Sequence, residues 1–174
     1  MIHVVTLEPF EAEEIQAVCR ALFAAFGVGS EHVGELELPD DARDGSKLDA
    51  AKVLSEAGPV KTFADDKILF LVQSPFADRP GPRGLLPTQG YAKYGADRAV
   101  ASAAGLAGDP EARGRALAKL AVHQVGHLWD LHHCLDYRCS MTPPWGVAYA
   151  RGQLPELCAF CREKSERRMK TTAA

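Results

Sequence analysis

The chain has 174 residues, of which 47% are hydrophobic and 25% charged, and its formal net charge is -3. These values are ordinary for a globular protein, and we expect residues 1–174 to form a single domain. The lack of net positive charge argues against nucleic acid or an anionic membrane as a partner. The first ten residues lack the basic start and long apolar run of a secretion signal, so we expect a cytoplasmic protein.

Hydrophobic periodicity and turn residues predict strands that alternate with helices. The expected strands are 2–7, 32–38, 68–72 and 96–101, and the expected helices are 11–26, 46–56 and 110–130. The apolar run of the third strand is typical of a central strand that is buried on both faces. The stretch 73–94, rich in Pro and Gly, is expected to be a long loop with at most a weak edge strand. This order of elements predicts a mixed sheet with helices.

Four of the six histidines lie at the end of the last predicted helix. His123 and His127 are four residues apart, so their side chains share one helix face and can converge on one zinc ion. A further helical turn would climb about 5.4 Å away from the ion, which disfavours Asp130 as the third ligand. His133 can supply that ligand if the helix breaks near Asp130, where aspartate tolerates a left-handed backbone better than most residues. Gly126 indicates that something packs closely on this helix.

Four of the five cysteines follow the histidines as two pairs, Cys134-x4-Cys139 and Cys158-x2-Cys161. Short-spaced pairs are typical of a closed, tetrahedral zinc site, which would anchor an otherwise irregular tail with few apolar residues. Two disulfides are the alternative, and they would require an oxidising compartment or a hyperthermophile's interior. Cys19 lies on the apolar face of the first predicted helix and is expected in the core.

These residues together resemble the archaemetzincins, a branch of the metzincin zinc peptidases with the pattern His-Glu-x2-His-x2-Gly-x2-His-Cys-x4-Cys-x-Met and a later Cys-x2-Cys. The chain matches every metal-ligand position of that pattern, with His123, His127, His133, Cys134, Cys139, Cys158 and Cys161. The resemblance implies an α+β, zincin-like fold, in which a mixed twisted sheet packs on the active-site helix within 1–131. It also implies two zinc ions per chain, the second in a four-cysteine site that holds a C-terminal subdomain, 132–174. Met141 would lie in a turn beneath the histidines, and an edge strand within 73–101 would align an extended peptide.

Two positions depart from the family pattern. Asp130 stands at the glycine of the helix-ending turn, and Gln124 stands at the glutamate that moves the proton of the attacking water. Glutamine cannot accept a proton, and general-base catalysis is worth about 10²–10⁴-fold, or roughly 3–5.5 kcal/mol of barrier. Gln124 is either the natural residue of a pseudoenzyme or a deliberate inactivating change, unless another group replaces the base. Asp130, Asp136, Glu156 and His132 are candidates, and of these His132 adjoins a ligand, although an exposed histidine is its simpler interpretation.

Three functions are compatible with this pattern. The leading hypothesis is a monomeric zinc metallopeptidase that acts on extended peptides and is weakened or inactivated by Gln124. The second is a zinc-dependent module that holds a peptide in the same cleft without cutting it. The third treats the four-cysteine site as a nucleic-acid-binding knuckle, because a basic run follows it: Arg162, Lys164, Arg167, Arg168 and Lys170. Glu163 and Glu166 interrupt this run, and a solvated terminal helix explains it better.

Overall fold

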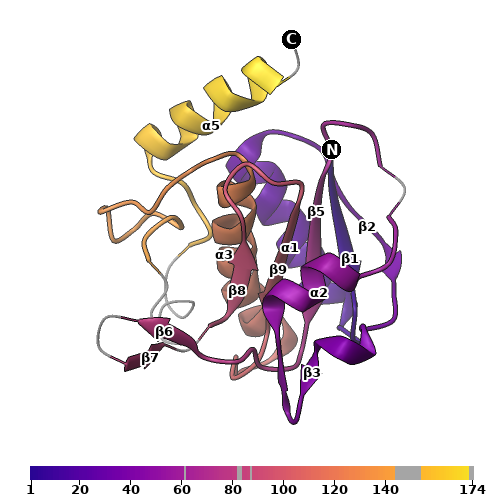
Figure 1. The fold of residues 1–174 in the computed structure, drawn as a ribbon. Coiled ribbons are helices and arrows are strands. Elements are labelled where there is room, and N and C mark those ends of the chain that lie inside the picture. The colour runs from indigo at the N-terminus through magenta and orange to yellow at the C-terminus, as the bar shows by residue number, and fades with distance from the viewer. Residues whose placement is uncertain (61, 82–83, 87, 144–153, 173–174) are drawn as a thin grey trace.

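The computed structural model describes residues 1–60, 62–81, 84–86, 88–143 and 154–172 (Figure 1). The elements are, in chain order, β1 (Ile2–Thr6), α1 (Ala12–Phe26), β2 (Ser30–Glu35), the 3-10 turn η1 (Asp40–Ala42), β3 (Arg43–Asp44), β4 (Lys47–Leu48), α2 (Ala50–Glu56), β5 (Lys67–Val72), β6 (Arg79–Gly81), β7 (Gly84–Leu86), β8 (Gly90–Ala92), β9 (Arg98–Ser102), α3 (Pro110–Leu128) and α5 (Ala159–Thr172). In these parts of the chain, no helix combines the length and the apolar character needed to cross a membrane.

Five strands form the main sheet, in the order β2-β1-β5-β9-β8. From β2 to β9 the neighbouring strands are parallel, whereas β8 pairs antiparallel with β9 and forms one edge. The central strand β5 is buried at every position, as its unbroken apolar sequence predicts. β8 lies within the stretch where the resemblance implied an edge strand, so the expected mixed sheet is confirmed.

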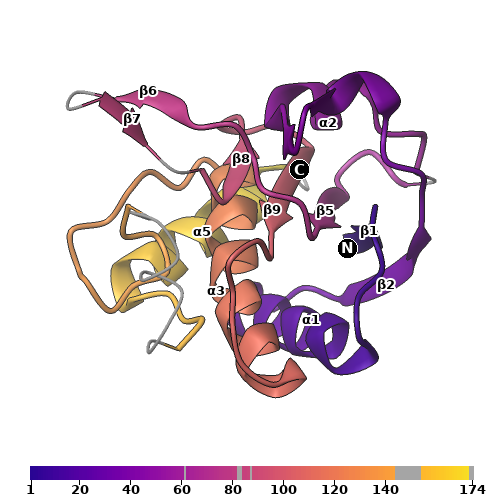
Figure 2. The same cartoon turned by 90° about the horizontal axis from the view of Figure 1, so that it is seen from below.

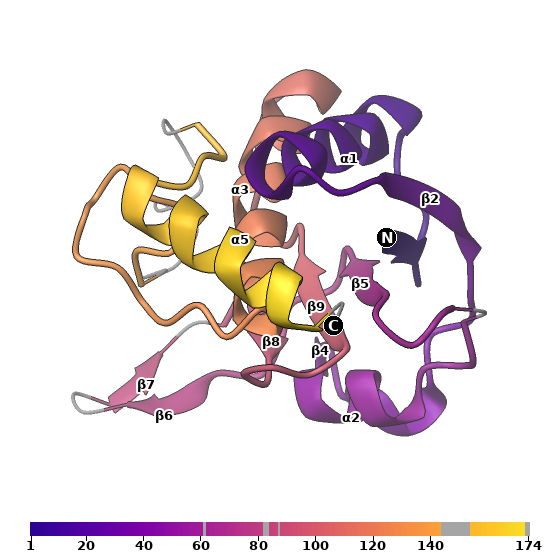
Figure 3. The ribbon, with the colours of Figure 1, turned by 90° about the horizontal axis from the view of Figure 1, so that it is seen from above.

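The sheet separates two layers of helices (Figures 2 and 3). On one face, Leu69 and Leu71 of β5 join a hydrophobic core with α1 and α3. On the other face, Ile68, Phe70 and Val72 pack in a second core with α2. Successive side chains of a strand point to opposite faces, so one six-residue strand connects both cores.

Several element boundaries differ by a few residues from the sequence-based prediction, and neighbouring elements explain two of them. β2 ends at Glu35 rather than at residue 38, since its parallel partner β1 ends at Thr6. α2 begins at Ala50 rather than at residue 46, because residues 47–48 pair with β3. Asp49 then caps α2, and its side chain accepts a hydrogen bond from the Ala51 N–H at 2.8 Å.

The stretch 73–94 contains the weak edge strand that was considered, β8, and also a hairpin that was not predicted. β6 and β7 form an antiparallel hairpin that projects from the body of the molecule (Figures 1 and 2), and β8 follows it. Residues 82–83 and 87 of this stretch lie outside the described residues. The many prolines and glycines hid short strands, because a two-stranded ribbon tolerates them better than a central strand does.

Helices α3 and α5 agree with two further predictions, the start of the histidine-bearing helix and the presence of a terminal helix. Asp109 caps α3, accepting from the Ala112 N–H at 2.7 Å, and Pro110 occupies the first turn as predicted. The basic run after Cys161 lies on α5, which confirms the expected terminal helix. α5 contacts α1 through Arg162, whose guanidinium donates to the Ala24 carbonyl at 3.0 Å. Cys19 is half-buried against the first core rather than inside it.

Candidate metal centres

The three predicted histidines come together at the end of α3. His123 and His127 lie one turn apart on the helix, His133 follows it, and one ligand nitrogen from each lies within 4.8 Å of the others. The ring centroids of His123 and His127 are 4.6 Å apart, and each is 5.3 Å from that of His133. The prediction that the chain folds back to bring His133 to the helix is therefore confirmed.

The reversal after α3 occurs at Asp130. Its backbone is left-handed, with a φ of 57°, and the N–H of the next residue, Leu131, donates to the Gly126 carbonyl at 3.0 Å. The Asp130 carboxylate accepts a hydrogen bond from Arg168 of α5 at 2.6 Å. Aspartate thus tolerates this turn as expected, and its carboxylate points to α5 rather than joining the histidine group.

The backbone fixes the protons on His123 and His127. The Nδ1 atom of His123 lies 2.7 Å from the carbonyl oxygen of Ser140, and that of His127 lies 2.8 Å from the carbonyl oxygen of Leu131. A carbonyl oxygen only accepts hydrogen bonds, so both Nδ1 atoms donate, and each neutral ring presents an unprotonated Nε2. These two Nε2 atoms are 3.0 Å apart, where their lone pairs repel each other. A cation that accepts both lone pairs removes this repulsion.

A shared proton does not account for the short separation, because all three rings are neutral near pH 7. Burial, together with the neighbouring histidines, lowers the pKa of His123 to about 3 and that of His127 to about 4. Burial and the proximity of His132 also lower the pKa of His133. Neutral imidazole is the form that binds a metal ion. The donor set therefore fits a dication such as zinc.

Met141 lies beneath the histidine turn, as the resemblance implies. Its side chain is completely buried, and a Cβ placed on Gly126 would overlap its sulfur and lie 3.1 Å from its Cε. The Met141 carbonyl also accepts from the Cys134 N–H at 2.9 Å, directly after His133. Glycine at position 126 leaves room for the methionine sulfur that packs against the helix. The expectation that something packs closely on the helix at Gly126 is therefore confirmed.

Gln124 faces the edge strand β8. It is 4% exposed, and a Cβ placed on Gly90 would lie 2.6 Å from its Nε2 and 2.7 Å from its Cδ. Its carboxamide therefore packs between the metal-binding helix and the strand that borders the site. A carboxamide donates and accepts hydrogen bonds but does not take up a proton near neutral pH.

Sequence reasoning missed Tyr94, which lies beside the histidines. Its ring meets His127 edge-on with centroids 4.9 Å apart, and it stacks on His132 at 4.4 Å. The next residue, Gly95, donates its N–H to the His127 carbonyl at 2.9 Å. No local pattern links Tyr94 to residues so much later in the chain. The structure therefore adds an aromatic side chain to the rim of the site.

The carboxylates considered as substitute bases lie outside the three-histidine group. No Asp or Glu oxygen belongs to that group among the residues that the structure describes. Asp130 pairs with Arg168, and Asp136 accepts from the Arg138 N–H at 3.0 Å. His132 is exposed, in agreement with its simpler interpretation, although Tyr94 connects it to His127.

The four predicted cysteines form a second group. One sulfur from each of Cys134, Cys139, Cys158 and Cys161 lies within 4.8 Å of the others, and the Cys134 and Cys158 sulfurs are 3.8 Å apart. A tetrahedral site with Zn–S bonds of about 2.3 Å has S···S edges of roughly 3.8 Å. All five cysteines of the chain are free thiols. Convergence of four sulfurs on one point supports a single metal ion rather than two disulfides.

Backbone N–H groups surround these sulfurs. Asp136 donates to the Cys134 sulfur at 3.4 Å, and the Cys139 sulfur receives the N–H groups of Cys158 at 3.4 Å and Met141 at 3.5 Å. Burial raises the pKa of the Cys139 thiol, so its deprotonation requires compensating positive charge. A metal ion supplies that charge, and N–H donors of this kind orient thiolate ligands.

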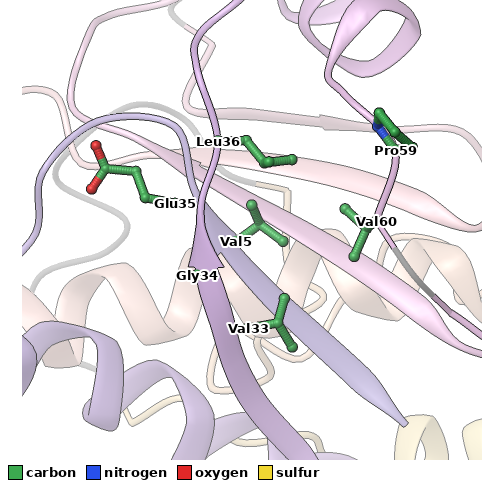
Figure 4. A pocket seen from close by; sticks show the side chains of 7 residues that line it. All are labelled: Val5, Val33, Gly34, Glu35, Leu36, Pro59 and Val60. Carbon is green, nitrogen blue, oxygen red and sulfur yellow. The ribbon is translucent and has the colours of Figure 1, made fainter.

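A separate pocket adjoins the second core, the one that contains α2 (Figure 4). It adjoins β2, at the opposite sheet edge from β8. It is lined by Val5, Val33, Gly34, Glu35, Leu36, Pro59 and Val60. Among the described residues, this lining is mostly apolar and contains no histidine or cysteine.

No protein-family model matches the sequence, and a search of curated proteins finds no match. Three crystal structures are similar to this chain in fold. The archaemetzincin of Methanopyrus kandleri has a TM-score of 0.82 and 23% sequence identity, and the alignment covers 97% of this chain and 94% of that protein. The archaemetzincin of Archaeoglobus fulgidus, complexed with malonate, has a TM-score of 0.77 and 20% identity, with 94% and 98% covered. A zinc-dependent peptidase from Methanocorpusculum labreanum has a TM-score of 0.76 and 19% identity, with 95% and 100% covered.

The chain thus combines a mixed sheet with a helix that carries two of three clustered histidines, beside a buried methionine. More closely, the fold is that of the archaemetzincins, over nearly the full length of the chain. The fold expected from the sequence is therefore confirmed.

Proposed function

We propose that this chain is a zinc-binding protein of the archaemetzincin type, with two zinc ions, that holds an extended peptide in front of its three-histidine site and hydrolyses it weakly or not at all. The observation that carries this proposal is the pair of unprotonated Nε2 atoms of His123 and His127, 3.0 Å apart. Neutral imidazoles suit zinc, and a site with three protein ligands keeps a coordination position open for a further ligand. The zinc-dependent peptidase of similar fold supports peptide as the ligand class.

The edge strand β8 gives the peptide its direction. Among the described residues, β8 pairs with β9 and is the last strand of the main sheet, and the edge of a sheet is where an extended peptide can add as a further strand. The Gln124 amide packs on β8 at Gly90, and Tyr94 follows the same strand. A peptide aligned here would pass between β8 and the histidine turn of α3.

Gln124 limits the rate of peptide hydrolysis that the site can support. Bound zinc would polarise a peptide carbonyl and acidify water. Gln124 can orient either group by a hydrogen bond, but it cannot take the proton from one and deliver it to the leaving amine. The missing general base is worth roughly 3–5.5 kcal/mol, so turnover should be lower by about 10²–10⁴-fold than with a carboxylate.

The four-cysteine group is proposed to hold the second zinc ion in a closed, structural role. Its ligands come from two segments, one that follows the histidines and one at the start of α5, so a bound ion ties the helix to the segment that follows the histidines. Four protein ligands leave no position for a substrate.

A cleavage assay tests the proposal directly. The chain and its Gln124→Glu variant are incubated with a peptide library, and the zinc content of both is measured. We expect cleavage to rise by about 10²–10⁴-fold in the variant while zinc content stays the same. Background hydrolysis in a zinc-loaded Gln124→Glu variant would contradict the peptidase assignment. Saturable peptide binding that a chelator abolishes, without turnover in either protein, would then favour the alternative of a peptide-binding pseudoenzyme.

The basic residues of α5 support a structural role rather than nucleic-acid binding. Arg167 pairs with Glu163 at 2.5 Å, one turn away, and Arg168 pairs with Asp130 at 2.6 Å. Acids thus offset two of the arginines of α5, which lowers the net positive charge that the helix offers to a phosphate backbone. We therefore propose a peptide, and no nucleic acid, as partner.

A further inference from the structure

Lys119 is a completely buried lysine in the metal-binding helix. Its exposed fraction is 0%, and it is among the largest fully buried side chains of the molecule. It precedes the metal-binding His123 by one turn of α3. Lysine is almost never fully buried unless its ammonium group is matched by negative charge, because removing a charge from water is costly.

The helix itself does not supply that negative charge. After Glu111, in the first turn of α3, the helix contains no Asp or Glu. The side chains that flank Lys119 along the helix are apolar and buried, from Ala116 to Val122. Any negative charge near this ammonium group therefore comes from an element that packs against α3.

Residues 140 and 141 pack against α3 at His123 and Gly126, and Cys139 directly precedes them. Met141 packs on Gly126, and the carbonyl of Ser140 holds the His123 ring one turn earlier. Continuing in the same direction brings Cys139 toward the turn that carries Lys119. Burial disfavours the charged form of the Lys119 ammonium, and negative charge on Cys139 favours it.

The four-cysteine group has an excess of negative charge when it holds a metal. Four thiolates around one dication carry a net charge of about -2. Cys139 is itself 0% exposed, so water does not solvate that charge at its sulfur. The N–H groups that reach the sulfurs contribute partial charges, whereas an ammonium group contributes a full one.

We propose that Lys119 is the internal counter-ion of the four-cysteine metal site, a positioning residue that stabilises the bound metal through Cys139. The lysine and His123 share a helix, so the counter-ion also links the structural metal to the turn that carries the other site. This inference rests on the proposed four-cysteine metal site and is independent of peptide hydrolysis.

The test compares Lys119→Met, which keeps the length of the side chain and removes its charge, with Lys67→Met as a matched control. Lys67 is also buried, but its Nζ donates to the Ala96 carbonyl at 3.0 Å, away from the cysteines. Each protein is loaded with Co²⁺, and a competing chelator is titrated while the thiolate-to-cobalt absorption band is followed. We expect the affinity of the cysteine site to fall about 10–100-fold in Lys119→Met and to stay within about threefold of the unchanged chain in Lys67→Met.

Two further variants separate charge from shape. Lys119→Arg keeps the positive charge and should retain more of the affinity than Lys119→Met, and Lys119→Gln replaces the methionine variant if that one does not fold. An affinity within about threefold of the unchanged chain in the neutral variant would overturn the proposal, and so would equal losses in the arginine and neutral variants. An unchanged chain without any thiolate-to-cobalt band would instead contradict the metal site itself.

Discussion

Substitution of Gly126 by alanine tests the contact between α3 and Met141. Alanine is normally favoured over glycine in a helix by about 1 kcal/mol. Here the added Cβ would overlap the methionine sulfur and lie 3.1 Å from its Cε and 3.5 Å from Leu131 Cδ1. Met141 is 0% exposed, so it has little room to move away, and overpacking of a core costs about 1–3 kcal/mol. The net expectation is a destabilisation of up to about 2 kcal/mol, which lowers Tm by up to roughly 4–8 °C for a chain of this size.

The assay is thermal unfolding of the zinc-loaded protein together with chelator competition at the histidine site. Gly58→Ala is the matched control, because its added Cβ would meet nothing closer than 3.8 Å. The double variant Gly126→Ala/Met141→Val should recover part of the loss, since the smaller side chain makes room for the methyl group. A Gly126→Ala protein that is more stable than the parent, with unchanged metal affinity, would refute the close packing of methionine and helix.

Two further changes have defined outcomes. Replacing Tyr94 by leucine removes its ring contacts with His127 and His132, so metal affinity at the histidine site should fall about two- to tenfold. Tyr94→Phe keeps the ring and should keep the affinity. Equal affinities of the leucine variant and the parent would disprove that the Tyr94 ring supports the metal site. Asp66 gives a pH-dependent contribution: burial alone would raise its pKa, but hydrogen bonds from the Phe63 N–H and from His3, with the Met1 amino group, hold the pKa well below its usual value. The stabilisation by the Asp66 carboxylate is therefore complete above about pH 4 and declines as the pH falls below that value. Asp66→Asn should lower the free energy of unfolding by about 1.5–3 kcal/mol at pH 7 and by progressively less toward pH 2. A pH-independent difference in denaturant unfolding would contradict the assignment.

The metal groups could be predicted from the sequence because their geometry is local. The spacing of His123 and His127 places both on one helix face, and paired cysteines converge wherever two short segments meet. The break at Asp130 also followed from local chemistry, since a helix that continued would carry the third ligand away from the ion. The fold was predictable mainly through the family pattern that these residues form.

The contacts that surround the metal groups could not be predicted, because they join segments far apart in the chain. Tyr94 reaches His127 from the turn after an edge strand, and Arg168 reaches Asp130 from the terminal helix. The burial of Lys119 was hidden as well, since an isolated lysine in a helical pattern is typical of an exposed face. Edge strands pair weakly and tolerate Pro and Gly, so β6, β7 and β8 had little sequence signal.

The most direct test of the account is the metal content of the purified chain, measured by elemental analysis beside two variants that each lose one site. We expect two zinc ions per chain, with one remaining in a variant that carries His123→Ala and His127→Ala, and one remaining in a variant that carries Cys158→Ser and Cys161→Ser. A single ion in the unchanged chain would contradict one of the two metal centres, namely the one whose substitution leaves that ion in place. A folded chain without metal would contradict both.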